Sequence, residues 1–220
     1  MSIITRRLLR QDIYDVVLTR VLDGSFAPGS RVRDTAVAEQ LGVSRTPARE
    51  ALVRLAQDGF LDADAGKGFR VRRLDSREVQ EIYPVVATLE CMALEMSVPL
   101  LAATVAKLDS LNHEIEECLD DPVRRIHLDE DWHRELLRRC DNQRLLSLIA
   151  GLKQRMRVYE YDYWRNTRLA ETSTHEHAEI AHALAANDLK SATELLRRQF
   201  DRSAERIIQW LGKDAGTTRQ

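Results

Sequence analysis

Apolar residues recur at helical spacing through the first part of the chain, where they predict three successive helices. The first helix ends near Asp23-Gly24. The second begins at a cap on Asp34 or Thr35 and closes at Gly42, and the third spans residues 44–57. Two helices joined by a tight turn at a glycine form the helix-turn-helix pattern. The apolar positions are Ile13, Val16, Val17 and Val21 in the first helix, Val37, Ala38 and Leu41 in the second, and Ala48, Ala51, Leu52 and Leu55 in the third.

A pair of short strand candidates follows the third helix, at residues 60–63 and 69–72. They flank the glycine-rich segment 64–68, which predicts the tip of a hairpin. Residues 31–33 form a further short extended piece. A hairpin beside a helix-turn-helix is a wing, so residues 1–74 are predicted to form a winged helix-turn-helix domain that binds DNA.

Beyond residue 75, apolar residues repeat with the helical period of about 3.6 in nearly every window, and no segment alternates as a strand does. This pattern predicts an antiparallel all-α helical bundle over residues 75–212, followed by a tail at 213–220. The fold is therefore expected to be mainly α, with two domains. The predicted bundle helices are 76–97, 100–119, 122–140, 143–165, 168–186 and 189–211.

The net charge of the whole chain is −2, which does not suggest a nucleic-acid-binding protein. The charge is unevenly distributed, however. Residues 1–74 hold 13 basic and 9 acidic side chains, whereas the remainder holds 20 basic and 26 acidic ones. A basic first domain followed by an acidic second domain predicts that only the first meets a polyanion.

The cysteines and the apolar stretches indicate the cellular compartment. Cys91, Cys118 and Cys140 form no CxxC pair, which favours free thiols in a reducing environment. The longest uncharged stretch, residues 96–106, is too short to span a bilayer, and the N-terminus carries no apolar signal segment. We therefore expect a cytoplasmic protein with no membrane partner.

The third helix separates its apolar face from an exposed face that carries Arg45, Thr46 and Arg49. Arg45 and Arg49 lie one turn apart at the N-terminal end, which is the end that contacts base edges in a major groove. Arginine binds guanine O6 and N7 in a bidentate manner, while Ser44 and the first-turn amides suit phosphate oxygens. Lys67 at the hairpin tip is placed to reach a phosphate or the minor groove. The alternative is a solvated helix beside an ordinary β-turn, and the combination of features favours DNA binding.

Four polar side chains fall on the inward faces of predicted bundle helices: Asp129, His133, His177 and Gln199. Buried without partners, each would cost about 1–3 kcal/mol or more. They must satisfy one another, bind a metal ion or line a wet pocket. One aspartate with two histidines suits a divalent transition metal, and the alternative is a hydrogen-bonded His–Asp network without an ion.

The stretch from Gly24 to Val71 resembles the winged-helix domain of the GntR family of bacterial transcription regulators. The resemblance is carried by the run LGVSRTPAREAL at 41–52, by the pairs at 54–55 and 58–59, and by Phe26-Ala27-Pro28-Gly29 upstream. It covers about a fifth of the chain with a specific signature.

This resemblance implies which residues touch operator DNA. Members related to the fatty-acid regulator (FadR) also use an arginine at the start of the second helix, where this chain has Thr35. Arg31 or Arg33, slightly upstream, is a candidate replacement. The contacts that the resemblance implies are Arg45, Thr46 and Arg49 of the third helix and Gly66, Lys67 and Gly68 of the wing tip.

Residues 76–211 resemble the FCD ligand-binding domain, the usual partner of this winged helix in the FadR subfamily. The matching runs are DEDWH at 129–133, NQRLL at 142–146 and EHAEI at 176–180. The resemblance implies a zinc or nickel site made by one aspartate and three histidines, although some members need no metal. Asp129, His133 and His177 match three of these ligands. Gln199 takes the place of the fourth, and its amide oxygen is a weak ligand for soft metals.

The resemblance also bears on the effector, the small molecule that such a domain senses. Carboxylate-sensing FCD domains commonly carry an arginine four residues before a helical glutamate, and these two positions are Val86 and Glu90 here. An acidic ligand would lose its main bidentate partner. We therefore expect an effector that is less acidic or more apolar than the small organic acids typical of the family.

The inward arc of the helix at 143–165 adds candidates for the effector pocket. Arg155, near this arc, is a candidate replacement for the missing arginine. Tyr159 and Tyr163 are candidates to present hydroxyls to the pocket, whereas the leucines are expected to be core. The members of the arc are Leu148, Leu152, Met156, Tyr159 and Tyr163.

Together these features predict a homodimeric, ligand-responsive regulator, most often a repressor in this family, that binds a palindromic operator. One alternative is a helical metallohydrolase joined to a DNA anchor. The sequence supplies no additional base or electrophile at motif spacing, so we expect no enzyme. A purely architectural protein is the other alternative, and the polar residues on the bundle's inward faces argue against it.

Overall fold

The computed structural model describes residues 3–22, 25–64, 68–73, 75–99, 102–118, 121–166 and 170–217. Contacts within the chain divide it into two compact units, Met1–Leu74 and Asp75–Gln220. Within the described ranges, all strands belong to the first unit and the second is helical. None of the helices in these ranges is long and apolar enough to cross a membrane.

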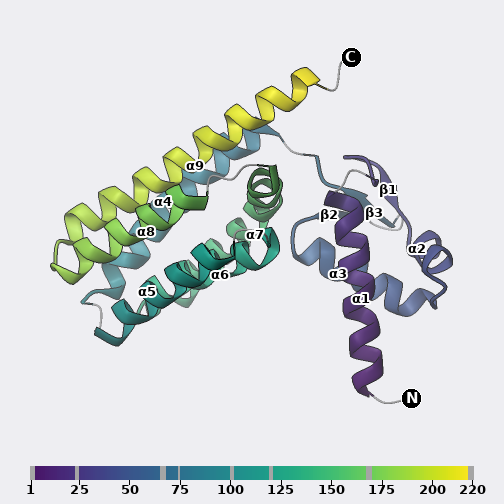
Figure 1. Cartoon of the computed structure of the whole chain (residues 1–220), viewed down its shortest axis with the longest axis horizontal. Coiled ribbons are helices and arrows are strands. Elements are labelled where there is room, and N and C mark those ends of the chain that lie inside the picture. Colours follow the sequence, from purple (N-terminus) through teal and green to yellow (C-terminus); the bar gives the residue numbers. More distant parts are fainter. Residues whose placement is uncertain are drawn as a thin grey trace. The chain divides into compact units, whose positions relative to one another are not determined.

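The first unit combines helices with a small antiparallel sheet (Figure 1). Strand β3 lies in the middle of the sheet order β1-β3-β2, and Phe69 on β3 is opposite Val32 on one side and Ala63 on the other. The predicted winged helix-turn-helix is confirmed, with each hairpin strand displaced by one residue from its predicted position. The elements are α1 (Ile3–Leu22), β1 (Arg31–Val32), α2 (Asp34–Leu41), α3 (Arg45–Gln57), β2 (Leu61–Asp64) and β3 (Gly68–Val71).

An apolar core beneath α3 holds the helix-turn-helix together. Val17 of α1 and Leu52 and Leu55 of α3 are completely buried, and these two helices pack against each other. Val16, predicted on the apolar face of the first helix, is 39% exposed instead. The core thus fixes which side of α3 faces inward.

The two ends of α2 differ in how well the sequence predicts them. Gly42 closes the helix with a left-handed φ of 64°, as its type predicts. The predicted cap at Asp34 or Thr35 is wrong, because the helix begins at Asp34 and the N-cap residue is Arg33. Asp34 therefore belongs to the first turn of α2, where its carboxylate accepts a hydrogen bond from the backbone N–H of Thr35.

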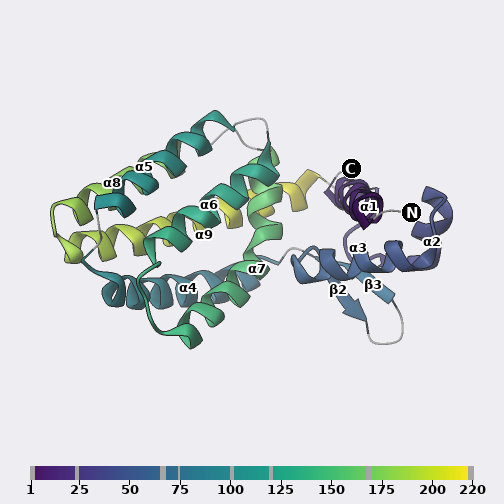
Figure 2. The ribbon, with the colours of Figure 1, turned by 90° about the horizontal axis from the view of Figure 1, so that it is seen from below.

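The second unit is a bundle of helices. Helix α9 packs against α4 and α8, α5 packs against α6 and α8, and α7 packs against α4 and α6. Figures 1 and 2 show α9 running alongside α4 and α8. The helices are α4 (Ser76–Ser97), α5 (Ala102–Glu117), α6 (Pro122–Leu136), α7 (Gln143–Asn166), α8 (Ala170–Ala185) and α9 (Leu189–Thr217).

Capping carboxylates start two of these helices. The side chain of Asp75 accepts a hydrogen bond from the backbone N–H of Arg77 before α4, and Asp121 accepts one from Arg124 before α6. Two predicted ends are wrong. Helix α6 stops at Leu136 instead of continuing to 140, and α9 continues to Thr217, so residues 213–217 are helical and not a tail.

Candidate nucleic-acid interface and candidate metal centre

Helix α3 presents opposite faces to the core and to solvent. Arg45 and Arg49, one turn apart at its N-terminal end, leave 69% and 63% of their side chains exposed. Thr46 is exposed beside them. These side chains therefore face solvent at the end of the helix that a DNA groove would receive. The inward residues Ala48, Ala51, Leu52 and Leu55 are all buried.

A hollow of about 670 Å³, open to solvent, lies beside these arginines. Arg31 of β1 and Arg33, the residue before α2, line it together with Arg45 and Arg49 of α3. Thr35 also borders it. Guanidinium groups that are far apart in the sequence thus gather around one surface, which suits the phosphates and base edges of a nucleic acid.

Other predicted contacts lie around the same end of α3 where the structure describes them. Gly68 opens β3 with a φ of +94° and borders the hollow. A Cβ at this position would lie 3.1 Å from the carbonyl oxygen of Val32. Ser44 is the exposed N-cap residue of α3, and its side chain makes no capping hydrogen bond. Gly66 and Lys67 lie outside the described residues.

An acidic residue stands within this basic surface. Oδ2 of Asp34 lies 3.4 Å from Nη2 of Arg45 and 3.5 Å from Nη1 of Arg49. Desolvation opposes ionisation of Asp34, but the charge of Arg45 and several hydrogen bonds outweigh it and lower the pKa of this carboxyl. Sequence reasoning treated Asp34 only as a helix cap and missed its contacts with both arginines.

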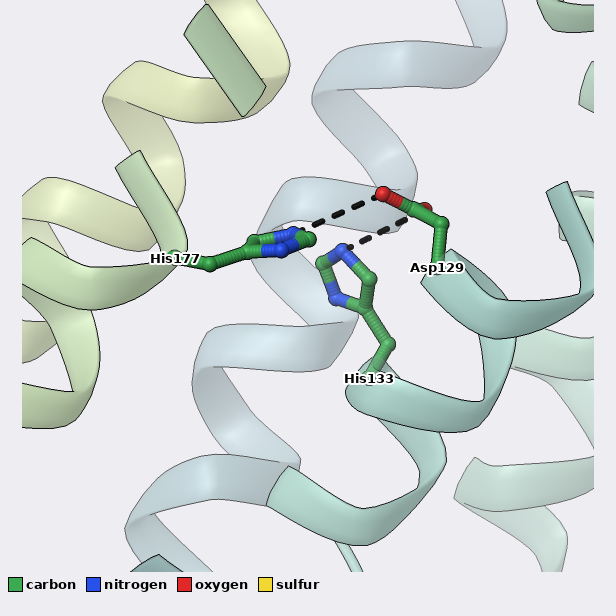
Figure 3. A group of neighbouring side chains, drawn as sticks. All are labelled: Asp129, His133 and His177. Carbon is green, nitrogen blue, oxygen red and sulfur yellow. Dashed lines mark ion pairs between the residues drawn. The ribbon is translucent and has the colours of Figure 1, made fainter. Parts of the chain in front are cut away.

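In the second unit, Asp129 and His133 stand one turn apart on α6, and His177 faces them from α8 (Figure 3). Nε2 of His133 lies 3.8 Å from Oδ2 of Asp129, and Nε2 of His177 lies 3.5 Å from Oδ1. One possible ligand atom from each residue lies within 4.8 Å of the others, and all three residues are buried. Helix packing therefore brings together the three predicted ligands at a separation that a single ion can bridge.

Partners on two further helices orient both imidazole rings. Nδ1 of His133 lies 2.6 Å from a carboxylate oxygen of Glu90 on α4, and Nδ1 of His177 lies 3.2 Å from Oδ1 of Asn112 on α5. The amide nitrogen of Asn112 donates to the carbonyl oxygen of Thr174, which leaves its Oδ1 to accept from His177. With protons on Nδ1, both rings direct an Nε2 lone pair toward Asp129. Carboxylate and carbonyl partners orient metal-binding histidines in this way.

Burial and neighbouring charges set the protonation of this cluster. Burial opposes ionisation of Glu90, but its contacts with His133 and Lys153 outweigh it and lower its pKa to about 2. Burial, reinforced by the proximity of His133 and Lys153, holds the pKa of His177 well below its usual value. His177 is therefore neutral near pH 7, which is the form that binds metals. Burial raises the pKa of Asp129. An adjacent metal ion would favour the ionised carboxylate and lower this pKa again.

Gln199 on α9 borders the same place. It lines a cavity of about 40 Å³ together with Asp129 and His133. Within the described part of the chain, neither Oε1 of Gln199 nor Nε2 of His177 has a hydrogen-bond partner, although both atoms are buried. Buried acceptors without donors are costly, and a cation beside them would remove that cost. One carboxylate, two imidazoles and an amide oxygen fit zinc or nickel, with the amide as the weakest ligand.

Two charged residues of α7 in this region were not predicted from the sequence. Lys153 is buried, and its Nζ lies 3.1 Å from the carboxylate of Glu90. Glu160 borders the small cavity, where burial and the neighbouring Asp129 raise its pKa to about 8. Sequence spacing contained a signal for Lys153, because it stands four residues after the buried Ile149 and three before the buried Met156.

A second cavity, of about 610 Å³, lies between α6 and α7. His133 and Lys153 line this cavity as well as the small one, so these two side chains stand between them. Glu90 and Arg157 are also in its wall. The apolar part of its lining consists of Leu137, Leu146, Ile149 and Ala150.

The predicted effector residues are not gathered in one place. Val86 is buried but lines neither of these two cavities, whereas Glu90 lines the larger one and Tyr163 the smaller. Tyr159 on α7 is buried beside the start of α4. Its hydroxyl contacts the carboxylate of Glu78 and accepts a hydrogen bond from the backbone N–H of Asp75. These residues therefore belong to different parts of the bundle.

The prediction that Arg155 lies near the inward arc of α7 is wrong. Its side chain is 54% exposed and pairs with Glu78. Leu148, predicted to be core, is 59% exposed, while Ile149 beside it is buried. The apolar stripe of α7 is thus rotated by about one residue at its start, and the buried cation on that stripe is Lys153.

Comparisons with known proteins agree with the two-unit organisation. Residues 9–71 match the model of the bacterial regulatory proteins of the gntR family, and residues 81–202 match the FCD domain. The Nta operon transcriptional regulator of Aminobacter aminovorans is 34% identical over 186 residues, which cover 84% of this chain and 87% of that protein. The transcriptional repressor RspR of Escherichia coli is 23% identical, with 91% and 90% covered.

Solved structures show the same fold. McbR/YncC of E. coli matches with a TM-score of 0.68 and 24% identity, and the match covers 92% of this chain and 98% of that one. A GntR regulator from Rhodococcus sp. RHA1 matches with a TM-score of 0.68 and 22% identity, covering 91% and 97%. These likenesses extend over both units of the chain.

Proposed function

This chain belongs to the gntR family of bacterial regulatory proteins and carries an FCD domain, and from this premise we propose that it is an effector-responsive repressor. Members of this family are DNA-binding transcription regulators and not enzymes, which sets aside the metallohydrolase alternative. We propose that it acts as a homodimer in which two winged helices bind the halves of a palindromic operator. Among its relatives, RspR is named as a repressor.

The observation that carries this proposal is the pair Arg45 and Arg49, exposed one turn apart at the N-terminal end of α3. Arg31 and Arg33 border the same hollow and supply further positive charge to a DNA backbone. Arg31 or Arg33 would take the role of the arginine that members related to FadR carry at the position of Thr35. Ser44 and Thr46 flank Arg45 in the sequence, and Gly68 borders the same hollow. These residues suit phosphate contacts through hydroxyls and backbone amides.

Substitution of both arginines tests this proposal. A duplex is first enriched from a random library by the wild-type protein, and a scrambled duplex of equal length and composition serves for comparison. Because each bidentate base contact contributes about 1–3 kcal/mol of discrimination, R45A/R49A should bind the two duplexes with nearly equal affinity. The double variant R77A/R124A removes two exposed arginines of the second unit and should keep the preference. Selective binding by a folded R45A/R49A protein would contradict the proposal.

For the second unit we propose a metal-assisted effector site. Asp129, His133 and His177 would hold zinc or nickel, with Gln199 beside them as a weak fourth ligand. The ion would supply a concentrated positive charge and an open coordination position for an effector atom. Glu90 and Asn112 would keep both imidazoles oriented whether or not an effector is bound.

The proposed effector is less acidic or more apolar than the small organic acids typical of the family. Val86 stands where an arginine would be needed, Arg155 faces solvent, and Lys153 is already held by Glu90. The effector must bind one arrangement of the dimer better than another if it is to change DNA binding. Calorimetric titration of the metal-loaded protein with organic acids and with neutral metabolites tests this, and tight binding of a small dicarboxylate would contradict it.

A further inference from the structure

Asp34 occupies an unusual position for an acidic side chain, because it lies among the cations of the proposed DNA interface. Its Oδ2 is shared between Nη2 of Arg45 and Nη1 of Arg49, at 3.4 and 3.5 Å. Its Oδ1 accepts the backbone N–H of Thr35 at 2.8 Å. The carboxylate is only 13% exposed and borders the same hollow as the arginines. One anion on α2 therefore holds two cations on α3.

These ion pairs contribute little to folding. Both arginine side chains are mostly exposed, and ion pairs of exposed groups typically add only about 0–1 kcal/mol. At 3.4 and 3.5 Å the two distances exceed the usual N–H···O range of about 2.7–3.2 Å, so these contacts are loose ion pairs. The effect of Asp34 on Arg45 and Arg49 is therefore one of orientation and charge. Each guanidinium directs one nitrogen to Asp34 and retains two others for a base edge.

The two kinds of DNA contact respond differently to such a carboxylate. A phosphate is a full anion, so Asp34 repels it and also neutralises part of the charge that attracts it. The O6 and N7 edge of guanine is a neutral acceptor, which a nearby carboxylate repels far less. An arginine that is held by Asp34 therefore loses more affinity for phosphates than for bases.

We propose that Asp34 is a specificity-determining residue that positions Arg45 and Arg49 for base edges and weakens their hold on phosphates. The inference rests on the proposed function, since it requires these arginines to meet DNA. It goes beyond that function because it assigns to an acidic residue the suppression of binding to unrelated DNA. A repressor needs such suppression, because unrelated sites greatly outnumber operators in a genome.

Asp34→Asn isolates the charge, because the amide oxygen still accepts from Thr35. Full-length D34N and wild type are compared by fluorescence anisotropy on the enriched duplex and on its scrambled partner, at several salt concentrations. We expect D34N to bind the scrambled duplex at least about threefold more tightly, with a salt slope steeper by up to about 0.9 per phosphate gained. The preference for the enriched duplex should fall by about fivefold or more, since less of the affinity comes from base contacts.

Glu39→Gln is the matched control, because Glu39 is an exposed acidic residue on the same helix. E39Q should keep both the preference and the salt slope of the wild type. Asp34→Ser provides a second variant with a side-chain acceptor for the helix start, and it should behave as D34N does. Thermal melts and circular dichroism verify folding.

The outcomes separate the two proposals. If R45A/R49A keeps its preference for the enriched duplex, the proposed function fails. If that variant loses its preference while folded D34N and D34S retain the wild-type preference and salt slope, only the inference about Asp34 fails. Equal weakening of D34N on both duplexes, or the same change in E39Q, would also overturn the inference, because it would indicate a structural or a general charge effect.

Discussion

The carboxylate of Glu90 lies 2.6 Å from Nδ1 of His133, although the two residues are on different helices. Glu90 is completely buried, and its other oxygen lies 3.1 Å from Nζ of Lys153. One carboxylate thus accepts from the ring N–H of His133 and pairs with the ammonium of Lys153 inside the bundle. This arrangement explains why a glutamate can be ionised in the core and why His133 presents Nε2 to Asp129.

Removal of the charge on Glu90 should destabilise the bundle. Glu90→Gln leaves the ammonium of Lys153 buried without its anion, and breaking a buried ion pair costs about 3–5 kcal/mol. Lys153→Met in the same chain removes the orphaned charge, so E90Q/K153M should recover part of the loss. Urea denaturation followed by circular dichroism measures both. Equal stability of E90Q and wild type would show that the Glu90–Lys153 pair does not contribute to the free energy of unfolding.

Gln199→His should tighten metal binding. An imidazole is a better zinc and nickel ligand than an amide oxygen, and position 199 borders the cavity that contains Asp129 and His133. We expect the affinity for zinc to rise by at least about tenfold, in keeping with the sensitivity of metal sites to their surroundings. Competition with a chromophoric chelator gives the affinity, and elemental analysis gives the stoichiometry. Q199N keeps the amide and shortens the side chain, so it should not tighten binding.

The partly buried carboxyl of Glu160 should make stability depend on pH. Its pKa is raised to about 8 in the folded chain, against an ordinary value of 4.5. Between these values the folded protein holds a proton that the unfolded chain has lost, so the free energy of unfolding falls as pH rises. The stabilisation by neutral Glu160 is complete below pH 4.5 and is lost as pH rises through 8.

Glu160→Gln should remove this dependence, which amounts to at most about 1.4 kcal/mol per pH unit. Urea denaturation between pH 5.5 and 8.5, with a chelator present, compares E160Q with the wild type. Glu95→Gln serves as the control because Glu95 is exposed on α4. Parallel stability profiles of E160Q and wild type across this range would refute the assignment.

Two glycines of the first unit should differ in their tolerance of alanine. Gly42 has a φ of +64° and no atom within 4 Å of an added Cβ, so G42A should cost only the left-handed strain of about 1–2 kcal/mol. Gly68 has a φ of +94° and the carbonyl oxygen of Val32 at 3.1 Å, so G68A should cost more. Amide hydrogen exchange of α3 and β3 in the full chain reports both losses. An equal effect of the two substitutions would contradict this account.

Periodicity predicts which face of a helix is buried, and that was sufficient for much of both candidate sites. The apolar stripe of α3 places Arg45 and Arg49 on the exposed side, and the stripe of α6 places Asp129 and His133 inside. On α7 the same reasoning failed only at the start of the helix, where Ile149 is buried and Leu148 is exposed, whereas Met156, Tyr159 and Tyr163 are buried as predicted. As a result, the exposed Arg155 was predicted near the inward arc, and the buried Lys153 was missed.

Contacts between helices could not be predicted from periodicity, because no local sequence pattern specifies which elements become neighbours. Glu90 was matched to the effector pocket through a resemblance, yet it hydrogen-bonds His133. Asn112 carried no signal at all, although it orients His177. Asp34 was interpreted within its own helix, while its main partners lie on the next one. These relationships depend on tertiary packing.

The contacts around His133 and His177 join segments from across the bundle. Glu90 comes from α4, Asn112 from α5, Lys153 from α7, and the two histidines from α6 and α8. No one of these helices can slide or rotate alone without breaking a hydrogen bond or ion pair between buried or partly buried side chains. These contacts consequently tie the helices together, and any rearrangement there must move several helices at once.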